Sequence, residues 1–168
     1  GALGHWIVVR DKKIANYLIQ ERVGSGGMGT VYRAEQVSLK RNVALKILAE
    51  HFSNNAEFIK KFVEEARFAA QFNHPNIVQV HDVGKDKETN TWFISMEFLG
   101  RGSLQDMITK TPKIELSQAI EWMIGAGRGL EYAEKKKLVH RDIKPDNLML
   151  SEDGTVKIAD LGIAKSFE

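Results

Sequence analysis

Hydrophobic and polar residues alternate along the first half of the chain, as they do in strands that bury one face. The alternation, together with many β-branched residues, predicts five strands, at residues 18–23, 30–36, 42–48, 77–83 and 91–98. A polar run at residues 85–90 predicts a hairpin turn between the last two strands. The pattern therefore indicates a sheet before residue 100.

A 3.6-residue period of apolar residues predicts a helix at residues 56–72, between the third and fourth strands. Phe62 and Ala66 lie on its apolar side, and Lys60 lies on the opposite side. His74-Pro75-Asn76 ends this helix, because proline cannot continue the helical hydrogen bonds.

Helical spacing returns after Gly100-Arg101-Gly102, which we interpret as a hinge. Ser103 is predicted to cap a short helix that ends at Thr109, and residues 117–136 predict a longer helix. Three glycines lie within the longer helix, at Gly125, Gly127 and Gly129. Each weakens a helix by about 1 kcal/mol relative to alanine, so we expect packing to stabilise it.

The end of the chain predicts a small strand pair, residues 148–150 with residues 156–159, around a turn at residues 152–154. A loop at residues 138–147 precedes it. The predicted order is therefore strands with one helix, then a hinge, then helices and a small hairpin.

The composition is that of an ordinary globular protein, with 168 residues, 43% of them hydrophobic and 27% charged. A net charge of +2 gives no reason to expect nucleic acid or an anionic membrane as a partner. The absence of cysteine excludes disulfides and fits the reducing cytoplasm, where we expect the protein. No apolar run is long enough to span a bilayer, and residues 1–16 are interpreted as an extension or a tag remnant.

Glycines gather between the first two predicted strands, in Gly24-Ser25-Gly26-Gly27-Met28-Gly29. Without side chains, such a segment lets main-chain N–H groups approach phosphates. A glycine-rich hairpin explains the same segment equally well when it is considered alone. A dinucleotide-binding loop is disfavoured, because Thr30-Val31-Tyr32 continues as a strand where that loop would open a helix.

Lys46 ends the predicted strand segment Val43-Ala44-Leu45-Lys46. Because side chains alternate along a strand, Lys46 would point opposite to Leu45, where its ammonium can reach phosphate oxygens under the glycine segment. An exposed strand lysine is the common alternative. Glu65, on the side of the helix that faces the sheet, is the expected ion-pair partner. Glu64 would point about 100° away and is assigned to solvent.

The densest group of polar residues is His140-Arg141-Asp142-Ile143-Lys144-Pro145-Asp146-Asn147, followed by Asp160-Leu161-Gly162. Asp142, Lys144, Asn147 and Asp160 supply two carboxylates, an ammonium and an amide, which can surround a metal-bound phosphate. A polar loop with caps and turns explains each residue singly, but not the set.

These motifs, in this order over residues 17–165, resemble eukaryotic-like serine/threonine protein kinases, and their texture is similar to that of bacterial members. The resemblance covers the amino-terminal part of the catalytic domain and stops after Asp-Leu-Gly. It implies an α+β fold with a five-stranded antiparallel sheet and helix C. The amino-terminal lobe with its hinge would occupy residues 17–99, and an incomplete, mainly helical carboxy-terminal lobe residues 100–168.

The resemblance also implies roles for the polar residues in transferring a phosphoryl group from Mg-ATP to a serine or threonine hydroxyl of a protein. Asp142 would orient that hydroxyl, and Lys144 would offset charge on the transferred group. Glu65-Ala66 resembles the family's helix-C glutamate context, so Glu65 would hold Lys46, and Lys46 would pair with the ATP phosphates. Asn147 and Asp160 would bind Mg²⁺. The nucleotide would lie against Gly24, Ser25, Gly26, Gly27, Met28, Gly29, Val31, Ala44, Lys46, Met96, Glu97, Leu99 and Met149.

The resemblance stops before the activation segment and the later helices of the family. We therefore expect Ile120, Met123, Ile124 and Leu130 to be partly uncovered, which favours self-association and weak or absent turnover. A nucleotide-binding or scaffolding module without transfer activity is the alternative function. A metabolite phosphotransferase is a further alternative, although Asp-Ile-Lys-Pro-Asp-Asn fits protein kinases better.

Overall fold

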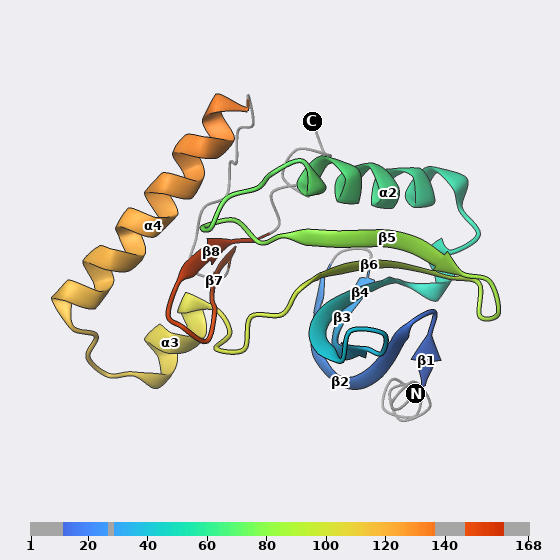
Figure 1. Ribbon diagram of the computed structural model, residues 1–168, viewed down its shortest axis with the longest axis horizontal. Coiled ribbons are helices and arrows are strands. Elements are labelled where there is room, and N and C mark those ends of the chain that lie inside the picture. The colour runs from blue at the N-terminus through green and yellow to red at the C-terminus, as the bar shows by residue number, and fades with distance from the viewer. Residues whose placement is uncertain (1–11, 27–28, 137–146, 160–168) are drawn as a thin grey trace. The chain divides into compact units, whose positions relative to one another are not determined.

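The structure is a computed structural model that describes residues 12–26, 29–136 and 147–159 (Figure 1). The chain separates into two compact units, each of which is described by itself. The first unit comprises residues 1–67 and 80–98, and the second comprises residues 68–79 and 99–168. The α+β class predicted from the sequence is confirmed, whereas the lobe boundaries stay predictions.

The first unit is built on an antiparallel sheet with the strand order β1-β2-β3-β4-β6-β5. The strands are β1 Lys13–Ile14, β2 Tyr17–Gly26, β3 Gly29–Gln36, β4 Arg41–Leu48, β5 Val80–Asp86 and β6 Thr91–Glu97. All five predicted strands are present, and the two-residue β1 is added at the edge beside β2. Ile14 of β1 is 4% exposed, so this edge strand contributes to the core.

The predicted strand at residues 77–83 begins later than expected, at Val80. Ile77 forms an isolated parallel bridge with Ile158 instead, and the Val78 N–H donates to the Ile158 carbonyl at 3.0 Å. The alternating pattern therefore correctly indicates an extended backbone in this segment, but its first residues pair with β8 in the second unit.

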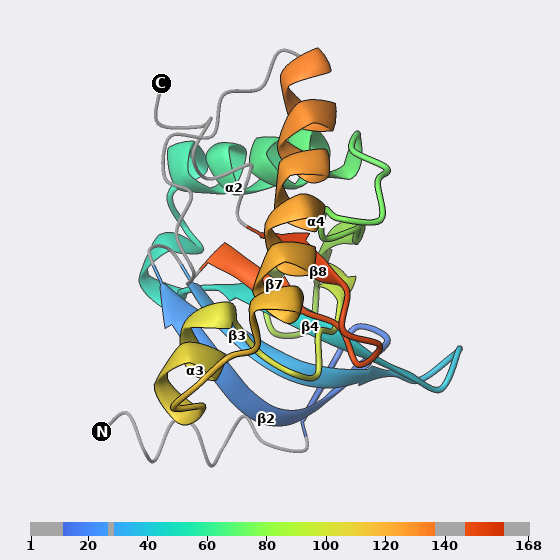
Figure 2. The ribbon, with the colours of Figure 1, turned by 90° about the vertical axis from the view of Figure 1, so that its left-hand side faces the viewer.

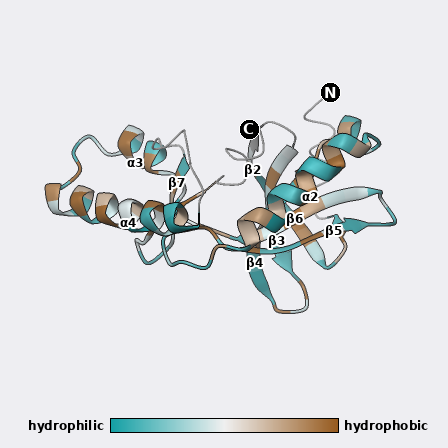
Figure 3. Cartoon of the chain, turned by 90° about the horizontal axis from the view of Figure 1, so that it is seen from above, coloured by the Kyte–Doolittle hydropathy of each residue, from teal (hydrophilic) through white to brown (hydrophobic). Residues whose placement is uncertain are grey.

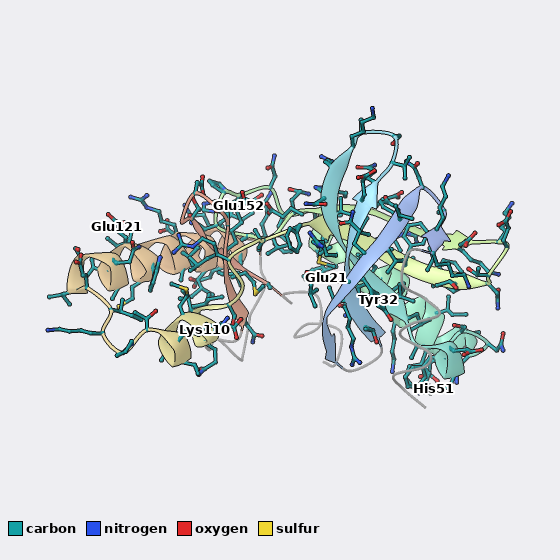
Figure 4. The ribbon with its side chains drawn as sticks, turned by 90° about the horizontal axis from the view of Figure 1, so that it is seen from below. Glu21, Tyr32, His51, Lys110, Glu121 and Glu152 are labelled. Carbon is teal, nitrogen blue, oxygen red and sulfur yellow. The ribbon has the colours of Figure 1, made fainter. Side chains whose placement is uncertain are left out.

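The two faces of the sheet bury different clusters. One face carries the cluster of Ile14, Tyr17, Ile19, Tyr32, Ala34, Val43, Leu45 and Phe93. Tyr32 (Figure 4) is buried there, and this burial raises the pKa of its phenol, although Arg22 and a hydrogen bond from Thr30 oppose the shift. Helix α2, Ala56–Ala70, packs its Phe62 and Ala66 with residues of the opposite face.

Helix α2 begins where the sequence predicts and follows the short 3-10 helix η1, Glu50–Phe52. Asn55 caps it, because its Oδ1 accepts the N–H groups of Glu57 at 3.0 Å and Phe58 at 3.3 Å. Figure 1 shows α2 lying along the sheet beside β5.

The second unit contains α3 Leu104–Lys110, α4 Leu116–Lys135, β7 Leu148–Leu150 and β8 Val156–Ile158. The predicted cap of α3 is confirmed: the Ser103 hydroxyl accepts the Asp106 N–H at 3.1 Å, and the Asp106 carboxylate accepts the Ser103 N–H at 3.2 Å. Figures 1 and 2 both show α4 running past the β7–β8 hairpin. No helix in the described ranges is long and apolar enough to cross a membrane.

The glycines of α4 fall into two kinds. A Cβ atom at Gly125 would lie 2.5 Å from Val156 Cγ1, and one at Gly129 would lie 2.8 Å from Ile158 Cδ1. A Cβ atom at Gly127 would have no heavy atom within 4 Å. Gly125 and Gly129 thus allow the helix to approach β8 closely, and this packing offsets their low helix propensity.

Hydrophobic residues recur along α4 (Figure 3), and several of them on the side away from Gly125 and Gly129 are exposed to solvent. Leu116 is 76% exposed, Met123 72%, Ile124 48% and Ile120 45%. The expected exposure of Ile120, Met123 and Ile124 is therefore confirmed. Leu130 is instead partly buried against the cluster that contains Ala133 and Ile158.

The two kinds of glycine predict opposite effects of the same substitution. Gly127→Ala should stabilise the chain by about 0.5–1 kcal/mol, because it only adds helix propensity. Gly125→Ala and Gly129→Ala should destabilise it by about 1–3 kcal/mol, because an added methyl group overpacks the contact with β8. Urea unfolding of the three variants checks this, and equal effects at all three positions would contradict the packing explanation.

Candidate functional site

The sheet register brings four predicted site residues to one face of the first unit. Val31 pairs directly with Lys46, and Ala44 pairs directly with Met96. Directly opposed residues point to the same face, as do residues two apart in one strand, such as Ala44 and Lys46. Met96 packs with the α2 cluster, so this is the face on which α2 lies.

Lys46 and Glu65 form the expected ion pair within this unit. Lys46 Nζ donates to Glu65 Oε1 at 3.3 Å, and each residue is only 8% exposed. Removing two charges from water is costly unless they compensate each other. The pair therefore holds an ammonium at a defined place beside Val31.

The choice between the two adjacent glutamates of α2 is also settled by the structure. The Glu64 side chain is 60% exposed and lies 4.0 Å from Lys60 on the surface of the helix. An exposed pair of this kind contributes little to stability. Glu65 is the residue that faces the sheet.

The glycine segment is partly described, and its glycines differ in their surroundings. Gly24 pairs with Val31 and Ser25 with Thr30, so the segment begins within the β2–β3 hairpin. A Cβ atom at Gly29 would collide with the Ile47 carbonyl, whereas one at Gly24 would meet no heavy atom within 4 Å. Sheet packing therefore requires glycine at position 29, whereas no packing contact requires it at position 24. Gly27 and Met28 lie outside the described residues.

The remaining predicted contacts of the base belong to the end of β6 and to the second unit. Glu97 is the last residue of β6. In the second unit, Leu99 is 8% exposed, and its carbonyl accepts the Gly102 N–H at 3.3 Å. The Gly102 carbonyl in turn accepts the Leu150 N–H at 2.8 Å, and Ser103 forms an isolated antiparallel β-bridge with Met149. The hinge segment is thus hydrogen-bonded along β7, the strand that carries Met149.

A main-chain hydrogen bond connects the two predicted metal-binding segments. The Ala159 N–H donates to the Asn147 carbonyl at 2.8 Å, and Asp160 is the next residue in the sequence. Asp160 itself, like Asp142 and Lys144, lies outside the described residues. Within the residues that the structure describes, no group of three or more histidine, cysteine, aspartate or glutamate side chains could hold a metal.

Val23 was missed by sequence reasoning. It lies at the bulge of β2, where the register shifts between Arg22 and Gly24, and is 48% exposed. Sequence reasoning placed Val23 only at the end of a strand, and it directly precedes Gly24. The bulge that marks it has no sequence signal of its own.

His81 is the titratable group next to the end of β6. Partial desolvation lowers the pKa of its imidazole, Arg41 lowers it further, and the Glu97 carboxylate opposes both effects. His81 is therefore neutral at pH 7, and it adds no positive charge beside Glu97.

The sequence profile described as "Protein kinase domain" matches residues 17–168 of this chain. The chain belongs to the protein kinase family. The probable serine/threonine-protein kinase of Clostridium acetobutylicum is 40% identical to it over 150 residues, or 89% of the chain. PknA of Mycobacterium tuberculosis is 39% identical over 155 residues, or 90% of the chain. PrkC of Bacillus subtilis is 38% identical over 148 residues, or 88% of the chain.

These relatives place the chain among serine/threonine kinases, and they confirm the resemblance seen in its motifs. The matched part is only 22% of the clostridial protein, 36% of PknA and 22% of PrkC. The kinase chain thus corresponds to much less than two thirds of each relative's length.

The buried ion pair of this kinase predicts a characteristic double-mutant cycle. Lys46→Met or Glu65→Leu alone should destabilise the chain by about 3–5 kcal/mol, because each leaves one buried charge uncompensated. The double variant should cost less than the sum of the two, because no buried charge remains. Chemical denaturation measures all three free energies of unfolding, and strictly additive effects would count against the pair.

Proposed function

We propose that this chain carries the nucleotide site of an ATP-dependent serine/threonine protein kinase, which transfers the γ-phosphoryl group of Mg-ATP to a protein hydroxyl. The observation that supports this most directly is the buried Lys46–Glu65 pair at 3.3 Å, on the same sheet face as Val31 and Ala44. A lysine held in this way can contact phosphate oxygens without losing its orientation.

The residues of the first unit suit a nucleotide. Val31, Ala44 and Met96 offer apolar contacts to a base, and the backbone at Glu97 would hydrogen-bond its edge. The open space at Gly24 leaves room for phosphates next to main-chain N–H groups. Ser25, Gly26, Gly27, Met28 and Gly29 would complete the cover of the phosphates.

The donor set of the second unit suits magnesium. Mg²⁺ prefers oxygen ligands and commonly takes one or two carboxylates together with substrate phosphates. The Asn147 amide oxygen and the Asp160 carboxylate are such ligands, and the hydrogen bond between Ala159 and Asn147 supports their proximity. When bound, Mg²⁺ neutralises charge on the phosphates.

The remaining proposed roles belong to Asp142 and Lys144. Asp142 would accept a hydrogen bond from the substrate hydroxyl and orient its oxygen toward the phosphoryl group. Lys144 would donate to the oxygens of that group as their charge redistributes. A cytoplasmic location, where ATP and reduced thiols prevail, is part of the same proposal.

Binding and transfer can be tested separately. ATP titrations with and without Mg²⁺ should show magnesium-dependent binding by the wild-type chain. Asp142→Asn should keep this binding and lower phosphotransfer to a serine-containing protein by about 100- to 10,000-fold, because positioning of the hydroxyl is lost. Transfer of radiolabelled phosphate measures this effect, with Asp82→Asn as the matched control at an exposed position.

The outcomes separate the alternatives. Binding without transfer by the wild type would favour the nucleotide-binding or scaffolding module. Failure to bind ATP would contradict the proposed nucleotide site.

We further propose that the chain associates with itself through the exposed stripe of α4, defined by Leu116, Ile120, Met123 and Ile124. Its four apolar side chains lie within two and a half helical turns and are each at least 45% exposed. Contiguous apolar patches of this kind commonly mark interaction surfaces.

Met123→Glu should therefore shift the chain toward monomer, because it places a charge at the centre of the stripe. Leu39→Glu, at a position that is 60% exposed in the first unit, is the control and should behave as wild type. Sedimentation equilibrium over a range of concentrations measures the assembly state. A wild-type chain that stays monomeric at high concentration would refute this surface.

A further inference from the structure

Strand β8 is held along both of its edges, although it has only three residues. One edge pairs with β7. On the other edge, the Ile158 N–H donates to the Asn76 carbonyl at 2.8 Å, and the Val78 N–H donates to the Ile158 carbonyl at 3.0 Å. The second edge is thus a short parallel pairing centred on Ile77 and Ile158.

The side chain of Asn76 completes this parallel pairing. In a regular parallel ladder, the main-chain N–H of Asn76 would donate to the carbonyl of Val156. That N–H donates instead to His74 Nδ1 at 3.0 Å. Asn76 Nδ2 replaces it and donates to the Val156 carbonyl at 2.9 Å.

Burial makes this replacement necessary. Asn76 is 9% exposed and Val156 is 2% exposed. A buried carbonyl without a donor is unfavourable, so the Asn76 amide stabilises the pairing at the start of β8. The absence of side chains at Gly125 and Gly129 leaves room for Asn76, because Cβ atoms there would each lie 2.9 Å from one of its atoms.

The segment that carries Asn76 is itself fixed to α4. The Asn73 N–H donates to the Tyr132 hydroxyl at 3.1 Å, and the His74 and Tyr132 rings are 5.0 Å apart. Asn76 therefore connects β8 to an anchored part of the second unit.

Strand β8 leads directly to the proposed magnesium ligands. Ala159 follows β8, and its N–H donates to the Asn147 carbonyl at 2.8 Å. Asp160 is the next residue. A shift of β8 would therefore move the hydrogen bond that holds Asn147, and changes in groups that orient metal ligands typically lower metal affinity by about 10- to 100-fold.

We propose that Asn76 is a positioning residue for the proposed magnesium ligand Asn147, on which it acts through Val156, β8 and the hydrogen bond from Ala159. The inference rests on the proposed function and extends it to a residue that touches neither metal nor nucleotide. The side-chain amide of Asn76 supplies the donor to the Val156 carbonyl that a main-chain N–H would supply in a regular parallel ladder.

The test compares Asn76→Ala with Leu104→Ala in the 168-residue chain. Leu104 is 8% exposed and packs in one cluster with Trp122, Leu150 and Val156, so its truncation is a destabilising control that loosens packing around the Val156 side chain but keeps the Asn76 donor. Binding of a fluorescent ATP analogue is titrated with Mg²⁺. The half-saturating Mg²⁺ concentration should rise about tenfold in Asn76→Ala. Affinity without Mg²⁺ should be unchanged, and Leu104→Ala should match wild type.

A second readout needs neither metal nor nucleotide. Hydrogen exchange at the Ile158 and Ala159 amides should be faster in Asn76→Ala than in Leu104→Ala. Asn76→Leu keeps a side chain of similar branching while removing the donor and adding no charge, so it should give the same shifts in Mg²⁺ requirement and exchange without creating a cavity.

Three results would overturn the inference. If both truncations change the Mg²⁺ requirement equally, or if the Ile158 and Ala159 amides stay as protected as in the control, the positioning role is wrong. Magnesium-dependent ATP binding by the wild type would then still support the kinase function. If the wild type does not bind Mg-ATP, the proposed function fails and this inference fails with it.

Discussion

The burial of opposite charges at Lys46 and Glu65 is the constraint on which the candidate site depends. Each charge loses most of its water, and the partner at 3.3 Å compensates for that loss. A rotation of α2 by about 100° that put Ala66 in the place of Glu65 would remove this carboxylate from Lys46. The pair thus fixes the orientation of the helix against β4, and with it the apolar face that Val31, Ala44 and Met96 share.

Much of the fold could be predicted because local signals agree with the tertiary structure. The apolar period of α4 placed that helix to within a residue at each end, and Ser103 marked the start of α3. The strand pattern located β2, β3, β4 and β6. It misplaced the start of β5, because alternation does not tell which strand a segment will pair with, and Ile77 pairs with Ile158.

The site was only partly predictable for a related reason. Charge and spacing indicated Lys46 and Glu65, since a buried pair leaves a recognisable combination of residues. Gly29 was assigned to phosphate approach, but the Ile47 carbonyl gives it a packing reason that no local pattern carries. Asn76 was interpreted only as part of a helix-ending motif, because its hydrogen bond to Val156 joins residues 80 positions apart.

The division of the chain has a consequence for how it can fold. The two units alternate along the sequence, so the chain passes from one to the other after residues 67, 79 and 98. Neither unit is one continuous stretch. A fragment ending at Phe98 would contain Phe72 and Ile77 but not Ala133 and Ile158, the partners that complete their cluster. A fragment cut after Phe98 would therefore lack part of its hydrophobic core. During synthesis, the chain must extend well past the hinge before this cluster can form.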